Sequence, residues 1–526
     1  MMKTMNTKHI LLPVLAFTLA GMTSCDDWLD IKPENKIVLE DFWQTESQVE
    51  SVLMSCYRGL TEKDVISRMI VWGELRSDNM TIGGSVKYDI YQILVGNIIS
   101  SNGFCSWDKF YSVINYCNTL LYYAPKVLEA DANFTQNDLN RITSEALAIR
   151  SLCYFYLVRS FNEVPWVEEA SISDNQLFQV PKSSEREILA HIEQDLIKSK
   201  QYIVRDFGNK VKNKGFMTLN AVNALLADVY LWMGCYSDCV NACNEVLADT
   251  KLSLVEGESF FTQVFYQGNS TESIFELQFD QRVQQNESVI DYYGDANDPY
   301  GDLSFPVALA YDAEDNVKGE NSPFNKKINS TVTESVDDIR CNEFIRPYSG
   351  MFFIFKYAGI RREENTPGKF TYRYRSTTPN WIVYRLPDVM LMKAEALVQL
   401  GGEANMKEAL TLVNTTYLRS NLTADSLRME TYPTKSDLAD LVLRERQREL
   451  LFEGKRWYDL VRLAKRENSV SALNSYVELK ASGSNAILGA PVMDAMYMPI
   501  SKTELSSNPF LTQNPYYEQK NSSSVR

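Results

Sequence analysis

One thiol near the N-terminus stands where a chemical modification is expected. Cys25 follows a short apolar run, Ile10–Ala20, and ends the stretch Met22-Thr23-Ser24-Cys25, which is similar to a bacterial lipobox. In a lipobox the thiol receives lipid, and cleavage leaves the cysteine as the first mature residue. The apolar run is too short to span a bilayer, which takes about 20 helical residues. We predict a lipoprotein signal peptide over residues 1–24 and lipidation of Cys25. The alternative is a plain signal peptide followed by an unrelated cysteine.

The two residues after this cysteine indicate where in the cell the protein is sent. Asp26 and Asp27 resemble the acidic export tag of Bacteroidetes surface lipoproteins. An acylated cysteine anchors a protein that does not itself cross the bilayer. We therefore expect the chain at the cell outer membrane, lipid-anchored and facing the extracellular side.

Tyrosines gather with short polar side chains in two segments that lack helical periodicity. Residues 76–106 are rich in Gly, Ser, Asn and Asp, and residues 250–380 carry many turn residues, so both are loops by composition. Aromatic rings stack on the apolar faces of sugar rings, while Asp and Asn hydrogen-bond to hydroxyls. The alternative role for each residue is packing of the loops. The candidate ligand-binding residues are Tyr88, Tyr91, Tyr292, Tyr293, Tyr300, Asp78, Asn79 and Asn297.

Patterns for catalysis and metal binding are weak. The chain has two histidines, of which His9 leaves with the signal peptide and His191 has no evident partner, so a Ser-His-Asp or Cys-His arrangement is hard to build. A glycosidase needs only two carboxylates, but 68 acidic residues make such pairs expected by chance. Cys235, Cys239 and Cys243 lie four apart, which predicts a buried helical stripe rather than a metal site. We predict no enzyme, no metal and no organic cofactor, and leave a structural calcium open.

Helical pairs are the dominant pattern along the chain. Residues 224–234 repeat apolar positions every three or four, end at Gly234 and are followed by a second helical segment, which is typical of tetratricopeptide repeats. The same pattern recurs near 391–413 and 145–158, and more faintly in 46–60 with 107–122. We predict a mostly α, tetratricopeptide-like scaffold of about four repeats within 40–250 and 385–465. Its expected core includes Trp72, Trp107, Trp232, Trp381 and Trp457.

Charge and composition narrow the function further. The net charge is −15 and no basic cluster is present, which disfavours nucleic-acid binding. No Gly/Ser-rich or Pro-rich linker divides the chain, so residues 25–526 are expected to form a single domain. Within it, the loop-rich segments at about 76–106 and 250–380 are the expected ligand-binding region.

Several motifs, in order along most of the mature chain, resemble the SusD/RagB family of outer-membrane nutrient-binding lipoproteins. They are residues 25–33, residues 74–79 (ELRSDN), residues 150–165 (RSLCYFYLVRSFNEVP), residues 384–396, residues 444–462 (RERQRELLFEGKRWYDLVR) and the tail from Pro499 to Tyr517. The block at 444–462 is the most specific of these. The resemblance implies a glycan-binding surface lipoprotein that pairs with a SusC-like TonB-dependent β-barrel transporter and delivers oligosaccharides to it.

Other roles stay open at this point. The RagB branch of the family implies peptides or other nutrients as the ligand, and a surface glycosidase or a pure assembly scaffold are further alternatives. Within the block 444–462, the acidic residues Glu449, Glu453 and Asp459 stand among many arginines. We predict that the block is a structural ion-pair network, with pairs between Glu445 and Arg448, Glu453 and Arg456, and Arg456 and Asp459 one helical turn apart.

Overall fold

The computed structural model describes residues 42–523, apart from 82–85, 173–175, 177–178, 281, 295–321, 326–333, 335–336, 349–350, 358–359, 367–368, 375–378 and 481–486. The predicted signal peptide and Cys25 lie outside the described residues, as do Asn297 and Tyr300.

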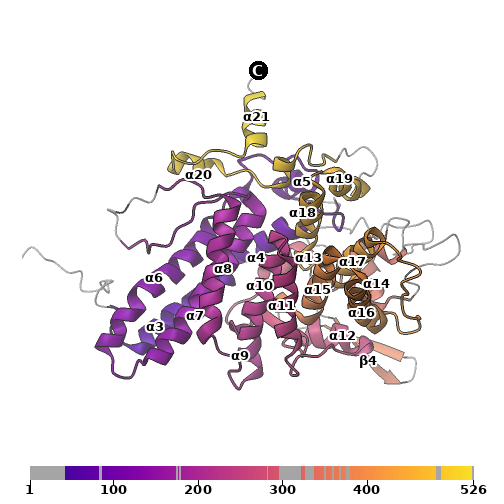
Figure 1. Ribbon diagram of the computed structural model, residues 1–526, viewed down its shortest axis with the longest axis horizontal. Helices are drawn as coiled ribbons and strands as arrows, with labels where there is room; N and C mark the ends of the chain where they lie inside the picture. Colours follow the sequence, from indigo (N-terminus) through magenta and orange to yellow (C-terminus); the bar gives the residue numbers. More distant parts are fainter. Residues whose placement is uncertain are drawn as a thin grey trace, which may run out of the picture.

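Packed helices form the body of the protein, as the sequence predicts. Figure 1 shows them following one another across the molecule, from α3 and α6 on one side to α16 on the other. The mostly α scaffold of about four helical pairs is confirmed. The pairs are α3 (Glu46–Leu60) with α6 (Asp108–Ala130), α7 (Gln136–Phe161) with α8 (Glu185–Tyr202), α10 (Leu219–Met233) with α11 (Tyr236–Leu247), and α15 (Leu386–Leu400) with α16 (Glu403–Ser420).

Local sequence signals set the ends of these helices. Before α7, the side chain of Thr135 accepts a hydrogen bond from the amide of Asp138, and the amide of Thr135 donates to the Asp138 carboxylate. Such a capping box satisfies amides that have no partner inside the helix. At the other end of a helix, Gly234 takes a left-handed conformation with φ of 76° and ends α10, as its position after the apolar run predicts.

Shorter elements fill the segments between the pairs. Among the residues that the structure describes, the strands pair in two-stranded antiparallel sheets, which join β1 (Ser273–Leu277) to β6 (Trp381–Arg385), β2 (Ile345–Tyr348) to β3 (Met351–Ile354) and β4 (Ile360–Thr366) to β5 (Lys369–Tyr374). The short helices are α4 (Lys63–Ile70), α5 (Tyr88–Leu94), α9 (Lys210–Gly215), α12 (Gly257–Phe260), α13 (Glu287–Tyr293), α14 (Ile339–Phe344), α18 (Arg456–Glu467), α19 (Ser471–Val477), α20 (Lys502–Ser507) and α21 (Pro515–Ser523). A further long helix, α17 (Lys435–Leu450), packs on α15.

The prediction of plain loops at 76–106 and 250–380 is therefore wrong in part. α5 lies in the first segment, while α12, α13, α14 and the strands β1 to β5 lie in the second. These elements are short, between four and seven residues each, so they give too few turns for helical periodicity to emerge from the sequence.

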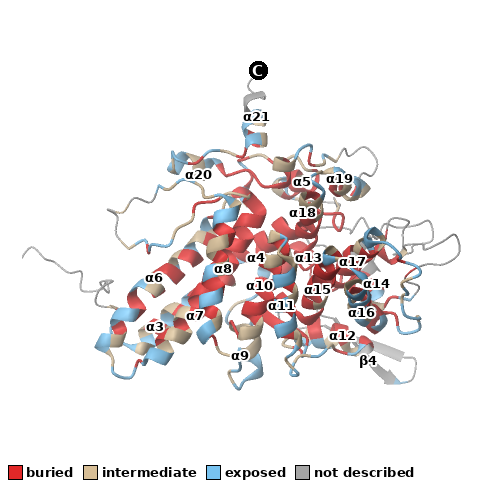
Figure 2. Ribbon diagram, viewed as in Figure 1, coloured by how far each residue is buried: buried red, intermediate tan, exposed pale blue. Residues whose placement is uncertain are grey.

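Buried residues run along the helices in the body of the protein (Figure 2), and many of them are apolar. One cluster of buried residues extends from Trp43 to Tyr517, and the five predicted core tryptophans are each at most 4% exposed. Cys239 and Cys243 are buried on α11, which confirms the predicted buried stripe for these two, whereas Cys235 is half-buried and precedes the first residue of the helix. Residues 210–233 are long and apolar enough to cross a membrane. However, 72% of their most apolar 18-residue stretch is buried inside the protein, as in a core helix.

The C-terminal segment after α19 crosses back over the first of the two loop-rich segments, 76–106, which we call the first insert; 250–380 is the second insert. The amide of Leu488 donates to the carbonyl of Val95 at 2.8 Å, and the amide of Lys502 donates to the carbonyl of Ser100 at 3.0 Å. The guanidinium of Arg76 donates to the carbonyls of Ala495 and Met496. The last part of the chain thus holds residues 76–100 in place.

A buried glutamate between α3 and α7 makes stability depend on pH. Burial raises the pKa of Glu145 to about 7, although Tyr57 and Arg141 both hydrogen-bond to its carboxylate. A carboxyl with a raised pKa in the folded state favours folding below its unfolded pKa of about 4.5, and that contribution is lost as pH rises to about 7.

We therefore expect the Glu145→Gln variant to lose less stability than the wild type between pH 4.5 and pH 7. The difference should be on the order of 1–2 kcal/mol. Urea unfolding of both proteins at several pH values measures it. Parallel pH profiles for the two proteins would contradict the raised pKa of Glu145.

Candidate functional site

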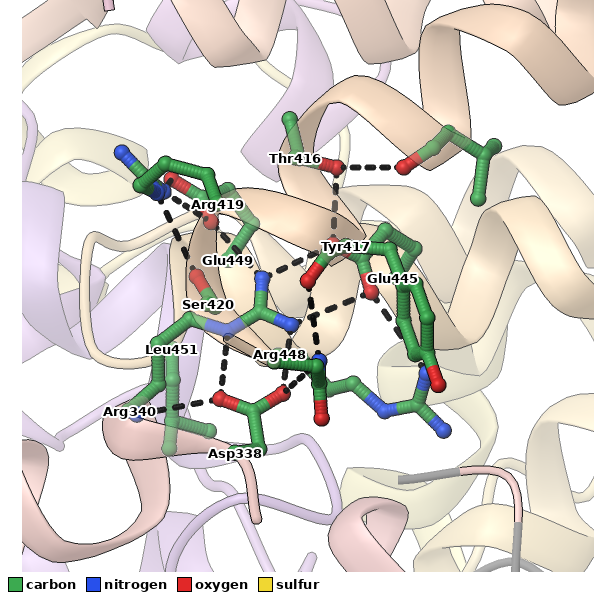
Figure 3. A network of polar contacts seen from close by, with 12 residues as sticks. Asp338, Arg340, Thr416, Tyr417, Arg419, Ser420, Glu445, Arg448, Glu449 and Leu451 are labelled. Atoms are coloured by element: carbon green, nitrogen blue, oxygen red, sulfur yellow. Dashed lines mark hydrogen bonds and ion pairs between the residues drawn. The ribbon is translucent and has the colours of Figure 1, made fainter. Parts of the chain in front are cut away.

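The block at 444–462 is a buried charge network and not a binding surface. Figure 3 shows the side chain of Arg340 between Asp338, Glu445 and Glu449, and all four side chains are fully buried. Arg419 donates to both oxygens of Glu449 at 2.5 and 2.6 Å. The prediction of a structural ion-pair network is confirmed.

The prediction that ion pairs form between residues one helical turn apart within that block is partly wrong. Glu445 does pair with Arg448, at 3.5 Å, but Glu453 pairs with Lys356 and Arg385 instead of Arg456. The reason is that α17 ends at Leu450 and α18 begins at Arg456, so the block is not one continuous helix and residues on either side of the break are not one helical turn apart. Between them Phe452 and Gly454 have φ of 68° and 70°, which turns the chain. Asp459 likewise pairs with Arg446 and Arg462 rather than with Arg456.

Asp78 and Asn79, predicted to contact ligand, belong to the same interior. Both carboxylate oxygens of Asp78 accept hydrogen bonds from Arg456 at 2.8 and 2.9 Å, and the side-chain oxygen of Asn79 accepts one from Gln447 at 2.8 Å. The side-chain amide nitrogen of Asn79 donates to the carboxylate of Glu74 at 2.7 Å. The two side chains are at most 1% exposed, so the prediction that they bind ligand at the surface is wrong.

The tyrosines at the end of α13 are also largely buried. Tyr293 stacks on Tyr357 with ring centroids 5.5 Å apart, and its hydroxyl donates to the carbonyl of Phe452 at 3.1 Å. Tyr292 is 8% exposed and meets Phe104 edge to face at 6.3 Å. The prediction of a surface ligand contact is wrong for Tyr293, which is 1% exposed. Tyr292 has only 8% of its surface exposed for such a contact. Both lie on a helix that their composition did not reveal.

The two inserts nevertheless converge on one surface, which we call the insert face. It consists of α5, the turn at 102–106 and α13, and its aromatic residues are Tyr88, Tyr91, Phe104 and Tyr292. Tyr88 is 66% exposed at the start of α5, while Tyr91 and Phe104 are half-buried. The contact between Phe104 and Tyr292 joins the first insert to the second.

Hydrogen bonds fix α5 to the neighbouring turn. The carboxylate of Asp89 accepts a hydrogen bond from the amide of Gly103 at 3.0 Å, and the side chain of Asn102 donates to the carbonyl of Asp89 at 2.8 Å. The side-chain oxygen of Asn102 also accepts from the amide of Phe104. The helix that carries Tyr88 and the turn that carries Phe104 therefore form one unit.

α4 lies beneath this unit and holds α13 as well. The guanidinium of Arg68 donates to the carbonyls of Ser106 at 2.7 Å and Gly103 at 3.2 Å. One residue earlier, the hydroxyl of Ser67 donates to that of Ser288 at 3.1 Å, and Lys63 pairs with Asp291 at 2.7 Å. Because α4 contacts both inserts, this short helix holds the parts of the insert face together.

An exposed ring beside polar groups suits stacking on an apolar ligand face. Phe104 is a member of this surface that the sequence pattern did not single out, although it lies inside the segment predicted to bind ligand, and the buried Arg68 supports it from α4. Three cavities of about 650, 770 and 600 Å³ lie elsewhere, and none is lined by a predicted ligand-binding residue.

His191 has partners that its sequence context did not show. It lines the cavity of about 600 Å³, stacks on Trp166 with centroids 4.6 Å apart, and lies 3.5 Å from the carboxylate of Glu168. Among the residues that the structure describes, no three His, Cys, Asp or Glu side chains are grouped to hold a metal ion.

Comparison with known proteins places the chain in a family. Residues 280–517 match the model of the SusD family, and residues 27–231 match a model described as starch-binding associating with outer membrane. SusD-like protein P38 of Formosa agariphila is 25% identical, over 96% of this chain and 98% of its own length. A SusD-like protein of Bacteroides ovatus is 22% identical, over 85% of this chain and 81% of its own.

Solved structures share the fold. A SusD homolog from Bacteroides thetaiotaomicron superposes with a TM-score of 0.68 at 21% identity, covering 90% of this chain and 99% of that one. B. fragilis NanU superposes with a TM-score of 0.66 at 19% identity, covering 93% and 100%. The family models match consecutive parts of the chain in the same order as the predicted motifs, and the fold agrees with both, so the chain belongs to the SusD/RagB family.

Proposed function

We propose that this protein is a cell-surface lipoprotein that binds oligosaccharides on the insert face and delivers them to a SusC-like TonB-dependent transporter. The observation that carries the proposal is the contact between the two inserts through Phe104 and Tyr292, with α5 and its exposed Tyr88 bonded to the turn that carries Phe104. The family description as starch-binding and associating with the outer membrane supports a glycan ligand at that membrane.

Binding without catalysis fits the chemistry of the described carboxylates. The acidic residues of the block 444–462 are each engaged by arginine or lysine in the interior, as Glu449 and Glu453 show. An acid that must exchange protons with a substrate needs access to it. A structural calcium in the acidic loops stays a prediction.

The membrane anchor of the proposal is Cys25. Lipid on this thiol would tether the chain with the insert face free to meet glycans outside the cell. Growth of the expressing bacterium with labelled palmitate tests the anchor, with a Cys25→Ala variant as the control. Label in the wild type alone, together with cleavage of the protein by protease added to intact cells, is the expected result. Equal label in both proteins would contradict it.

Copurification tests the partner. Affinity capture of the native protein from outer membranes should retain a TonB-dependent β-barrel, and its absence after capture of the lipidated protein would contradict delivery to a transporter.

The ligand surface itself gives a direct prediction. We expect Tyr88→Ala to weaken glycan binding about tenfold, because loss of one stacking ring is worth roughly 0.5–1.5 kcal/mol. Isothermal titration against a glycan panel measures the effect. Tyr202→Ala is a matched control, since Tyr202 is similarly exposed at 56% but lies at the end of α8.

The panel also separates this proposal from the alternatives. If the protein binds peptides and no glycans, its ligands are peptides instead. If Tyr88→Ala and Tyr202→Ala weaken binding equally, the ligand does not bind at the insert face.

A further inference from the structure

A cleft of about 770 Å³ lies between α3 and α6, and none of its lining residues belongs to the insert face. Ligand sites in proteins typically have volumes of about 300–1,000 Å³. The two helices approach closely at Gly59, where a Cβ atom would lie 2.7 Å from Cγ2 of Val113 and 3.7 Å from the ring of Tyr116. All three residues line the cleft, so α3 and α6 form two of its walls. The amide of Ser171 donates to the side-chain oxygen of Asn115 at 2.8 Å and holds a third wall against α6.

Tyr116 presents an aromatic ring to this cleft. It is 44% exposed, and among the described residues no other ring and no cation packs on it. Tyr122 on the same helix differs, because the ammonium of Lys126 lies 3.9 Å from the centroid of its ring. The open face of Tyr116 is therefore available to stack on the apolar face of a sugar ring.

Three charged side chains also line the cleft. They are Arg58 and Glu62, which are exposed, and Lys109, which is half-buried. Within the part of the chain that the structure describes, none of the three forms an ion pair or a side-chain hydrogen bond. The net charge of the cleft is +1, in a chain whose net charge is −15. Two cations without counter-ions favour a ligand with a carboxylate, which an arginine binds through two parallel hydrogen bonds.

A buried donor at the cleft has no acceptor. Trp43 lines the cleft and is 4% exposed, and its Nε1 has no hydrogen-bond partner among the described residues. The indole ring is held in place, because it stacks on Tyr123 with centroids 4.9 Å apart and an interplanar angle of 8°. Buried donors normally have a partner, and an unpaired one destabilises the protein. An acceptor oxygen that entered the cleft at Trp43 would remove that cost.

We infer that this cleft is a second ligand site and that it binds a sugar with a carboxylate, such as a uronic acid. The sugar ring stacks on Tyr116 while its carboxylate pairs with Arg58 and Lys109. The sugar hydroxyls donate to Glu62, and one oxygen accepts from the indole of Trp43. The inference goes beyond the proposed function, because it requires no ligand at the insert face.

The helical walls favour a sugar over a peptide. The backbone groups of α3 and α6 bond within each helix, so an extended peptide has no strand edge to pair with. Recognition therefore comes from side chains, and the cleft adds the hydroxyls of Ser112 and Thr119 and the amide of Asn115 to its ring and its charges. Groups that donate and accept in this way suit a ligand rich in hydroxyls.

Isothermal titration of the protein with matched sugars tests the inference. The probes are the disaccharides of galacturonic acid and of glucuronic acid, each as the free acid and as the uncharged methyl ester. We expect at least one acid to bind, at least about tenfold more tightly than its ester, since hydrogen bonds between charged groups are the stronger ones. Failure of both acids to bind would overturn the inference.

A double variant tests the two cations. Arg58→Gln with Lys109→Gln should remove the preference for the acid over its ester. Arg186→Gln with Lys212→Gln is the matched control, because these two exposed residues lie on α8 and α9 and do not line the cleft. An equal effect of both double variants would show that total charge, and not the cleft, attracts the acid, and the inference would fail.

Two aromatic variants test the walls. Tyr116→Ala should weaken binding of the acid about tenfold, whereas Tyr122→Ala, which is 48% exposed on the same helix but outside the cleft, should not. Trp43→Phe keeps a ring to stack on Tyr123 and removes the unpaired donor. It should also weaken binding, while the unfolding temperature of the free protein stays the same or rises. Wild-type affinity in both Tyr116→Ala and Trp43→Phe would place the acid outside the cleft.

The inference and the proposed function can fail separately. Tyr88→Ala should leave binding of the acids unchanged, and Tyr116→Ala should leave binding of neutral glycans unchanged. Loss of acid binding in Tyr88→Ala alone would assign these sugars to the insert face and overturn the second site. Binding of triglutamate that depends on Arg58 and Lys109, with no binding of either acid, would overturn the sugar as the ligand. Absence of neutral glycan binding counts against the proposed function and leaves the cleft unaffected.

Discussion

Replacement of Glu449 by glutamine is expected to destabilise the protein by about 3–5 kcal/mol, the usual cost of removing one partner from a buried ion pair. Burial alone would raise the pKa of this carboxyl, but three arginines around it outweigh burial and hold the pKa well below its ordinary value. Glu449 is therefore charged in the folded protein. The neutral amide would leave Arg340, Arg385 and Arg419 with less negative charge than their own burial requires.

Urea unfolding followed by circular dichroism measures this loss. Glu403→Gln is the matched control, because Glu403 forms a surface pair with Lys407 on α16 and is largely exposed. Surface pairs contribute little, so its unfolding midpoint should not change measurably. A Glu449→Gln protein with the wild-type midpoint would show that the network contributes no net stability through this residue.

The second large effect is expected at Gly73, in the π-helical turn Val71–Leu75. A Cβ atom on Gly73 would lie 1.9 Å from the carbonyl oxygen of Gly454 and 2.5 Å from its carbon. Both neighbours are backbone atoms, so no side chain can rotate to make room. We expect Gly73→Ala to destabilise the protein by about 3 kcal/mol, at the upper end of the cost of overpacking.

A second glycine provides the comparison for this variant. A Cβ on Gly103 would meet only the end of the Asp89 side chain, its Oδ2 at 3.2 Å, which can shift by a few tenths of an ångström. Thermal unfolding of Gly73→Ala and Gly103→Ala should therefore show a large loss of stability in the first and a small one in the second. Equal losses would mean that the close approach of the two backbones does not restrict position 73.

Much of the scaffold could be predicted from sequence because its signals are local. The residues of α3, Glu46–Leu60, coincide with the predicted helix, and Gly234 and Gly401 follow the ends of α10 and α15. Periodicity over fifteen residues and a glycine stop are properties of neighbours along the chain. The buried tryptophans follow from the same pattern.

The candidate site could be predicted only as a region. Asp78 and Asn79 look like loop residues until Arg456 and Gln447, which lie 378 and 368 positions later, are seen to bind them. No local pattern encodes a partner at that separation. The misplaced pairs of Glu453 and Arg456 fail for the same reason, since the turn at Phe452 and Gly454 sends each side chain to a distant segment.

The crossing of the C-terminal segment over residues 76–100 has a consequence for how the protein matures. Arg76 bonds to carbonyls 419 and 420 positions further on, so the contacts that hold the segment carrying Tyr88 form only after Ala495 and Met496 have been synthesised. Contacts of such long sequence separation form slowly. A chain that stops before residue 495 would therefore keep its helical pairs but lose the contacts that hold this segment, and the glycan binding that we propose would require the later residues.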